Sequence, residues 1–237
     1  MSWHIGNIET LDATGLYFRL GKMSRRTLPM LDSITGDFIE QEFANAPYTH
    51  VLLDWDLELC ALARNPILSP TPNGISRRLA ELLNDQAVLN ETSETYRIGP
   101  VRDPADFLDV LDSAYAIRSF SFTFTRKNLF DANKDFVIPF EHLVGEAKAT
   151  EGKVSLKGPD LDSQPVKEIA SSAAASGDGA SARVQITADS GPTTRSLHGD
   201  AASVPADDLD TNQAREQALN AARDEHERIR RAGGETA

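Results

Sequence analysis

The stretch Arg118–Lys127, RSFSFTFTRK, decides the fold because its apolar and polar residues alternate one by one. Phe120, Phe122 and Phe124 fall on one face of an extended chain, and the Ser and Thr residues between them fall on the other. A period of two over this length predicts a β-strand. Because helical patterns flank this segment, we expect it to lie centrally in a sheet whose aromatic face is covered by helices. The chain is therefore predicted to be an α+β protein.

The N-terminal part of the chain is predicted to form an antiparallel meander. Short apolar runs alternate with turn signals between residues 3 and 64, which indicates four or five strands. The longest run, residues 51–64, is either one bent strand or two strands with a break near Trp55. Apolar residues then recur at helical spacing over residues 75–83, which predicts a helix that covers the meander. We assign residues 1–92 to this meander and its helix.

Residues 93–198 are predicted to form a mixed α/β sheet around the phenylalanine strand. A helix starts at Asp103-Pro104, where Asp is a good N-cap and Pro a good first helical residue, and Tyr115 is expected to face inward from it. The remaining elements of this region are expected to be a short strand at 96–98, a short helix at 141–150, strands at 153–157 and 181–188, and a helix at 166–175.

The C-terminal region, residues 199–237, is expected to be a linker followed by a charged helix. Ala, Asp, Ser and Pro dominate residues 199–210, which leaves little to bury. Residues 211–232 have helical propensity, but their larger apolar residues are only Leu219 and Ile229. Such a helix is predicted to be loosely docked, frayed, or waiting for a protein partner or a second copy of the chain.

The composition limits which kinds of protein this chain can be. A chain of 237 residues with 40% hydrophobic residues can bury a substantial core. Its net charge of −12 argues against nonspecific coating of nucleic acid, although a local basic patch can still contact phosphates. We find no leader-like start and no apolar run long enough to span a membrane, so the cytoplasm is the default expectation. The single cysteine, Cys60, is predicted to be a buried structural thiol.

One candidate for catalysis is the segment Asp54-Trp55-Asp56-Leu57-Glu58. If this segment is a strand, its three carboxylates lie on one face, and clustered carboxylates are what Mg²⁺ requires in metal-dependent phosphodiester cleavage. The alternative is the solvated face of a half-buried strand. Because this alternative explains the same alternation, we assign no catalytic residue, metal or cofactor, and we keep Mg²⁺ only under a nuclease hypothesis.

Two weaker motifs were also considered for metal chemistry. Residues 131–135 have the carboxylate spacing of a calcium loop, but Phe136 stands where such a loop needs Gly. Residues 146–148 and 151–153 each contain the Glu-x-Lys of metal-dependent nucleases. That motif belongs on a strand beside an acidic strand, whereas the first copy is expected on a helix and the second at a turn. We therefore assign no site to either motif.

The phenylalanine strand resembles, over seven residues, the aromatic strand motif of RNA-recognition-motif domains. In that family exposed rings stack on bases, so the resemblance implies single-stranded RNA binding. Here the opposite face of the strand holds only Ser and Thr, and exposed rings would leave those hydroxyls to form the core. We therefore predict that the rings are core residues.

A local excess of positive charge is the candidate for nucleic-acid binding. Arg19, Lys22, Arg25 and Arg26 occur within eight residues that contain no acid, and this segment is expected to form a hairpin. The dyad Arg77-Arg78 lies on the polar side of the first helix and could extend the patch. The alternative is an ordinary solvated hairpin.

Three hypotheses for function follow. The first is a non-catalytic accessory protein that contacts DNA or RNA phosphates through the basic hairpin, such as a component of a bacterial regulatory or anti-phage system, a context for which the residues supply no motif. The second is a protein-interaction or oligomerising subunit that uses the helix at 211–232. The third is the carboxylate-dependent nuclease.

Overall fold

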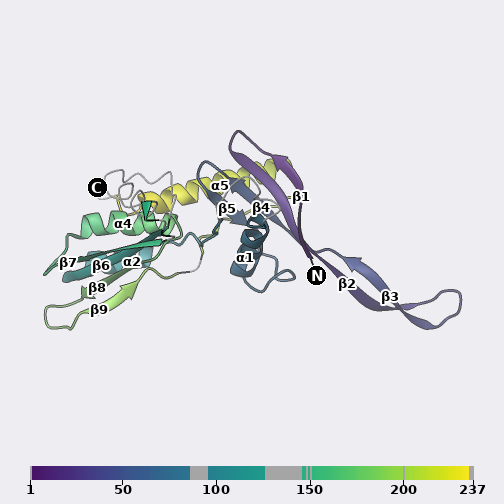
Figure 1. The fold of residues 1–237 in the computed structure, drawn as a ribbon, viewed down its shortest axis with the longest axis horizontal. Coiled ribbons are helices and arrows are strands. Elements are labelled where there is room, and N and C mark those ends of the chain that lie inside the picture. Colours follow the sequence, from purple (N-terminus) through teal and green to yellow (C-terminus); the bar gives the residue numbers. More distant parts are fainter. Residues whose placement is uncertain are drawn as a thin grey trace. The chain divides into compact units, whose positions relative to one another are not determined.

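The computed structural model describes residues 2–85, 96–125, 146–147, 149, 151–199 and 201–234. The chain forms two compact units, each containing an antiparallel sheet and helices (Figure 1). The first unit comprises Met1–Ile98 with Asp207–Leu219, and the second comprises Gly99–Ala206 with Asn220–Ala237. The predicted α+β class is confirmed.

The first unit contains the predicted meander. Its elements are β1 (Ser2–Thr10), β2 (Gly15–Leu31), β3 (Phe38–Asn45), β4 (Tyr48–Asp54), β5 (Leu59–Leu62) and α1 (Pro72–Leu83). The strand order is β1-β2-β4-β5, and β3 pairs with the distal half of β2. The apolar run over residues 51–64 forms two strands, β4 and β5, which was one of the two alternatives. The helix expected over residues 75–83 is α1. Its N-cap, Thr71, accepts a hydrogen bond from the backbone N–H of Gly74.

Apolar residues cover both faces of the first sheet. On one face Phe18, Leu20 and Val51 pack against Ile75 and Leu79 of α1. Strand alternation places Tyr17 and Leu52 on the other face, where they pack against Leu209, Ala218 and Leu219. The paired ends of β2 and β3 continue beyond this core as a two-stranded ribbon, residues 24–45, which we call the arm (Figure 1).

The C-terminal helix α5 (Asn212–Arg231) is docked, which corrects the expectation of a loosely attached or frayed helix. Leu219 is 1% exposed in the first unit, and Ile229 is 0% exposed in the second. The side chain of Arg215 is also buried; its guanidinium bonds to Glu9 at 2.5 Å and lies 3.9 Å from the centre of the Tyr17 ring. The apolar residues of this helix are few, but the two large ones, Leu219 and Ile229, are both buried within the chain.

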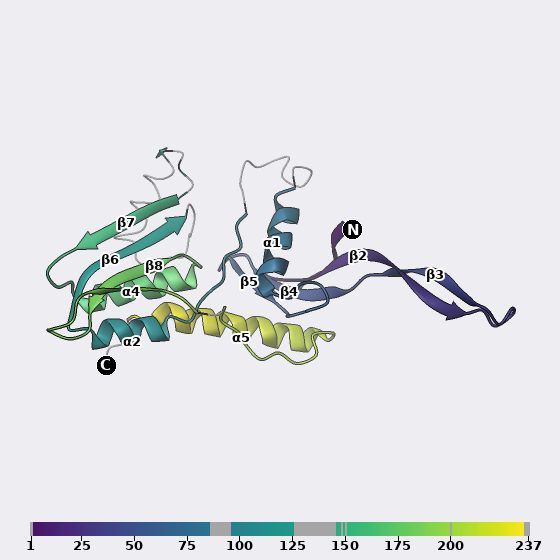
Figure 2. The same cartoon turned by 90° about the horizontal axis from the view of Figure 1, so that it is seen from below.

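The second unit is built around the phenylalanine strand. Its elements are α2 (Ala105–Ser113), β6 (Ala116–Thr125), β7 (Glu151–Lys157), α4 (Ser163–Ala175), β8 (Ala180–Gln185) and β9 (Thr193–Ser196), with the strand order β7-β6-β8-β9 (Figure 2). The predicted central position of the strand is confirmed. All the strand pairs are antiparallel, whereas a mixed sheet was expected. The reason is that the helical connection through α4 joins β7 and β8, which lie on either side of β6 instead of next to each other.

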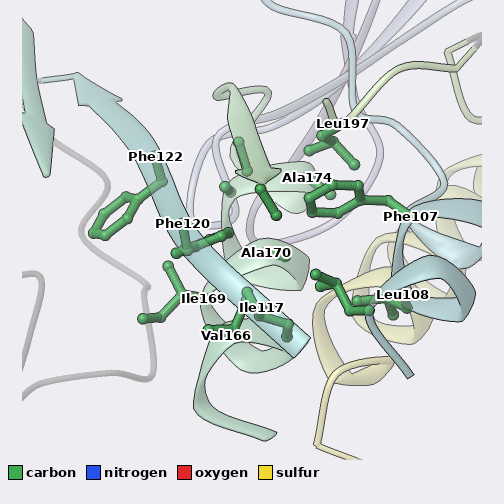
Figure 3. Packing of buried hydrophobic residues seen from close by; sticks show 14 of the residues in the cluster. Phe107, Leu108, Ile117, Phe120, Phe122, Val166, Ile169, Ala170, Ala174 and Leu197 are labelled. Atoms are coloured by element: carbon green, nitrogen blue, oxygen red, sulfur yellow. The ribbon is translucent and has the colours of Figure 1, made fainter. Parts of the chain in front are cut away.

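Helices cover the aromatic face of this sheet (Figure 3). Phe120 is 0% and Phe122 is 5% exposed, which agrees with the prediction that these rings are core residues. Small residues of α4 such as Ala170 and Ala174 let the helix backbone approach the rings closely. Tyr115 is 60% exposed, so its predicted inward position is wrong, because the helix before the strand ends at Ser113. The segment at 96–98 has no strand pairing, and most of the helix expected at 141–150 lies outside the described residues.

Candidate functional site

The carboxylate trio does not form the array that a metal would need. The strand β4 ends at Asp54, and residues 55–58 form a turn, so the expected strand over the trio is wrong. Asp54 is 2% exposed and accepts hydrogen bonds from the Thr14 hydroxyl and the Leu57 backbone N–H, both at 2.9 Å. Glu58 has a φ of +50°, which turns its backbone away from a strand direction. Asp54 therefore acts as a structural anchor for the turn.

The other predicted metal motifs gain no support from geometry. Residues 131–135 lie outside the described residues, as does Lys148 of the first Glu-x-Lys. The second Glu-x-Lys begins strand β7 and is not at a turn, which corrects that expectation. Its neighbour β6 contains no acidic residue, so the partner carboxylate of such nucleases is missing from that strand. No group of three potential metal ligands occurs among the described residues.

Two of the four cations of the basic hairpin segment are paired with acids of this chain. Arg19 bonds to Asp210 at 2.6 Å and to the Tyr17 hydroxyl at 3.0 Å, and its guanidinium carbon lies 4.4 Å from the centre of the Tyr48 ring. Arg25 lies 3.4 Å from Glu42 on the neighbouring strand. Arg19, which is half-buried and held by several partners, is less available to a phosphate. The Arg25 pair is exposed and therefore weak, so it hinders a phosphate contact little.

The dyad on α1 is paired as well. Arg77 lies 3.7 Å from Glu81, and Arg78 also forms an ion pair with this carboxylate. Of the six cations proposed from the sequence, Lys22 and Arg26 form no ion pair among the described residues, and both side chains belong to the even-numbered face of β2. The hairpin and α1 therefore do not present one continuous set of free cations.

A different surface, the open face of the sheet in the second unit, groups cations with hydroxyls. Because Phe120 and Phe122 point toward the helices, the residues between them point away from the core. The strand register places these outward residues in three rows: Lys157, Ser119, Arg183 and Thr194; Ser155, Ser121, Ser181 and Ser196; and Lys153 beside Thr123. Within the middle row the hydroxyl oxygens of Ser121 and Ser181 are 2.9 Å apart. We call these three rows the hydroxyl face.

The hydroxyl face carries three cations that no acid among the described residues neutralises. Lys153, Lys157 and Arg183 are exposed, and none forms an ion pair with another described residue. No Asp or Glu occupies the three rows, and Glu151 belongs to the row that follows them. From strand spacings, the Cα atoms of Lys157 and Arg183 are ~10 Å apart, and those of Lys153 and Lys157 are ~13 Å apart. The three positive charges therefore share one small surface.

Part of the hydroxyl face could be recognised in the sequence. The segment Lys153–Lys157, KVSLK, alternates cation, apolar and hydroxyl residues, and it was predicted to be a strand. Arg183 lies in a similarly alternating strand. Their proximity depends on both strands pairing with β6 in a particular register, which cannot be read from the order of residues.

A buried polar cluster in the first unit is structural in character. The Tyr17 hydroxyl and Nδ1 of His50 are 2.9 Å apart, and Arg19 and Arg215 approach the same tyrosine. Burial lowers the pKa of His50 below its ordinary value. Because both arginines are already bonded to carboxylates, Asp210 and Glu9, this cluster holds the C-terminal segment against the sheet.

Comparison with known proteins adds no functional assignment. No helix among the described residues is long and apolar enough to cross a membrane. Neither a protein-family model, nor a curated protein, nor a solved structure matches this chain.

Proposed function

We propose that the protein is a non-catalytic binding protein that contacts the phosphates of single-stranded nucleic acid through its hydroxyl face. The observation that carries this proposal is the grouping of Lys153, Lys157 and Arg183, without an acid in their rows, in a chain whose net charge is −12. A local surplus of cations against such a background favours a ligand that is itself a polyanion.

The hydroxyls of this face suit the backbone of a nucleic acid. Lys and Arg neutralise phosphates, while Ser and Thr hydroxyls donate hydrogen bonds to phosphate and sugar oxygens. The three rows contain no aromatic ring on which a base could stack. Binding is therefore expected to be weak and indifferent to base sequence, since base stacking and base-edge contacts supply most of the affinity and specificity of other single-strand readers.

The shape of the surface favours a single strand over a duplex. The three cations project from one face of a four-stranded sheet, and the distances between them are set by the strand spacing and not by the pitch of a double helix. A flexible single strand can bring successive phosphates to cations at any such spacing. A duplex presents its phosphates only at the fixed spacings of its two backbones.

The test is fluorescence anisotropy with labelled 20-residue oligo(dT) and oligo(U) at about 50 mM salt, where screening is weak. The informative variant is Lys153→Gln with Lys157→Gln and Arg183→Gln, which removes three exposed positive charges. The matched control, Lys22→Gln with Arg25→Gln and Arg26→Gln, removes the same charge from the hairpin. We expect the first variant to abolish binding and the control to keep it.

Two results contradict this proposal. If the parent protein forms no complex at tens of micromolar protein and about 50 mM salt, the chain does not bind single strands usefully. If the hairpin variant loses binding and the sheet variant keeps it, the site is the basic segment that the sequence suggested, and the hydroxyl face has no role.

A further inference from the structure

The arm exposes apolar side chains on a ribbon of only two strands. Leu28 is 44%, Met30 is 41% and Ile39 is 43% exposed, and β3 pairs with no strand other than β2 among the described residues. A two-stranded ribbon is marginally stable in water by itself, and contiguous exposed apolar residues mark interaction surfaces. The arm is therefore the best candidate for an interface with another macromolecule.

The strand register sorts the arm into two faces of different character. On one face the opposite pairs are Arg26 with Phe43, Leu28 with Gln41, and Met30 with Ile39. The row beyond them joins Asp32 and Asp37, whose backbones are hydrogen-bonded at 2.8 Å. We call this face the Arg26 face. Along the arm it carries the cation Arg26, then the side chains of Leu28, Gln41, Met30 and Ile39, and finally the two acids of the row beyond them. Glu40 and Glu42 belong to the other face.

We propose that the Arg26 face binds the same face of a second copy of this chain, with the two arms antiparallel. Arg26 lies in β2, and Asp32 directly follows its last residue, so they stand three residues, ~10 Å, to either side of position 29. The Asp32 carboxylate accepts hydrogen bonds from the backbone N–H groups of Ile34 and Thr35, so the exposed Asp37 is the more accessible acid of this row. A two-fold axis at position 29 places Arg26 of each copy on the Asp32–Asp37 row of the other. The same axis lays Leu28 of one copy against Met30 of its partner.

The arrangement of charges on the Arg26 face favours a second copy of the chain over other binding partners. An apolar surface alone accepts many partners, but opposite charges at equal distances from its centre are what a two-fold contact requires, because each surface must complement itself. A nucleic acid is disfavoured here because the row of Asp32 and Asp37 would repel phosphates. The arm is short, so the dimer is expected to be weak and dependent on concentration.

Analytical ultracentrifugation of the full chain tests the proposal with charge exchange. Arg26→Asp places only acids at both ends of the two-fold contact, so it is expected to weaken self-association about tenfold or more. Asp37→Lys places a lysine opposite Arg26 beside the remaining Asp32, so it is expected to weaken self-association less. A mixture of the two variants is expected to restore association. In the mixed dimer one end pairs Asp with Lys and the other pairs Arg with Asp. This complementation requires that position 26 of one copy contacts position 37 of the other, as the antiparallel contact provides.

A third variant and a folding control make each outcome decisive. Met30→Glu buries a charge at the centre of the contact and is expected to abolish association alone or in any mixture. All three positions are exposed, so unchanged urea denaturation serves as the check that each variant is folded. The proposal is overturned if the parent stays monomeric at about 1 mM, or if the mixed charge variants associate no better than either alone. Association that survives Met30→Glu also overturns it, because the interface then lies elsewhere.

Discussion

Docking of the C-terminal helix on the first sheet can be tested by truncating one side chain, Leu219→Ala. Leu219 is 1% exposed and packs with Tyr17, Leu52 and Leu209. Its Cδ2 atom lies so close to Gly15 that a Cβ added there would come within 2.5 Å of it. Because a strand backbone cannot collapse into the space that the substitution leaves, we expect a loss of about 3–4 kcal/mol, in the upper half of the range for buried leucines.

The assay for this loss is urea denaturation followed by tryptophan fluorescence. Both tryptophans, Trp3 and Trp55, belong to the first unit, so the signal reports the part of the chain that Leu219 stabilises. The matched control is Gln217→Ala, an exposed position on the same helix that is expected to change stability by less than about 0.5 kcal/mol. If Leu219→Ala has as small an effect as the control, the helix does not dock on this sheet and the expectation of a loosely attached helix returns.

Four further predictions concern single side chains. Phe122→Ala is expected to cost about 3–5 kcal/mol in urea denaturation followed by circular dichroism, since the ring is buried; a cost below 1 kcal/mol would exclude a core role. Asp54→Asn is expected to cost about 1–3 kcal/mol because it weakens two hydrogen bonds of a buried carboxylate, whereas Asp56→Asn is expected to cost almost nothing. Added Mg²⁺ is expected to leave the thermal midpoint of the parent unchanged. Cys60 is half-buried, and burial raises the pKa of its thiol to about 12, so its alkylation at about pH 8 should be much slower in the folded protein than in urea. Burial also lowers the pKa of His50 below 6.5, so the imidazole binds a proton more tightly in the unfolded chain than in the folded one. The stability of the first unit should therefore fall as the pH drops below about 6.5, and it should fall less in the variant His50→Gln.

Segments with one buried face could be predicted, because their apolar residues recur in the sequence at the period of a strand or a helix. Alternation along the phenylalanine strand correctly identified Phe120 and Phe122 as buried, and helical spacing over α1 correctly identified Ile75 and Leu79. The side chain of Phe124 lies outside the described residues. The turn at 55–58 could not be predicted in this way. Its residues alternate as a strand would, and one of the two hydrogen bonds that hold the Asp54 carboxylate in the turn comes from Thr14, forty residues earlier in the chain.

The candidate sites depend on contacts between distant segments, so the sequence revealed only their composition. Arg19 is a member of a basic run, yet its partner Asp210 lies far along the chain in a segment that reads as a linker. Conversely, Lys157 and Arg183 are isolated cations in the sequence, and the register of two strands on either side of β6 brings them into one row. Charge runs along the chain are therefore a poor guide to charge patches on this fold.

The salt dependence of single-strand binding tests the central proposal most directly. Three phosphate contacts by Lys153, Lys157 and Arg183 predict that log K falls with log salt with a slope of roughly −2, since each contact to a single strand contributes about −0.7. The measurement compares this slope for oligo(dT) between the parent and the variant with all three cations changed to Gln. The account predicts a slope near zero, or no measurable binding, in the variant. A variant that binds with the slope of the parent contradicts it.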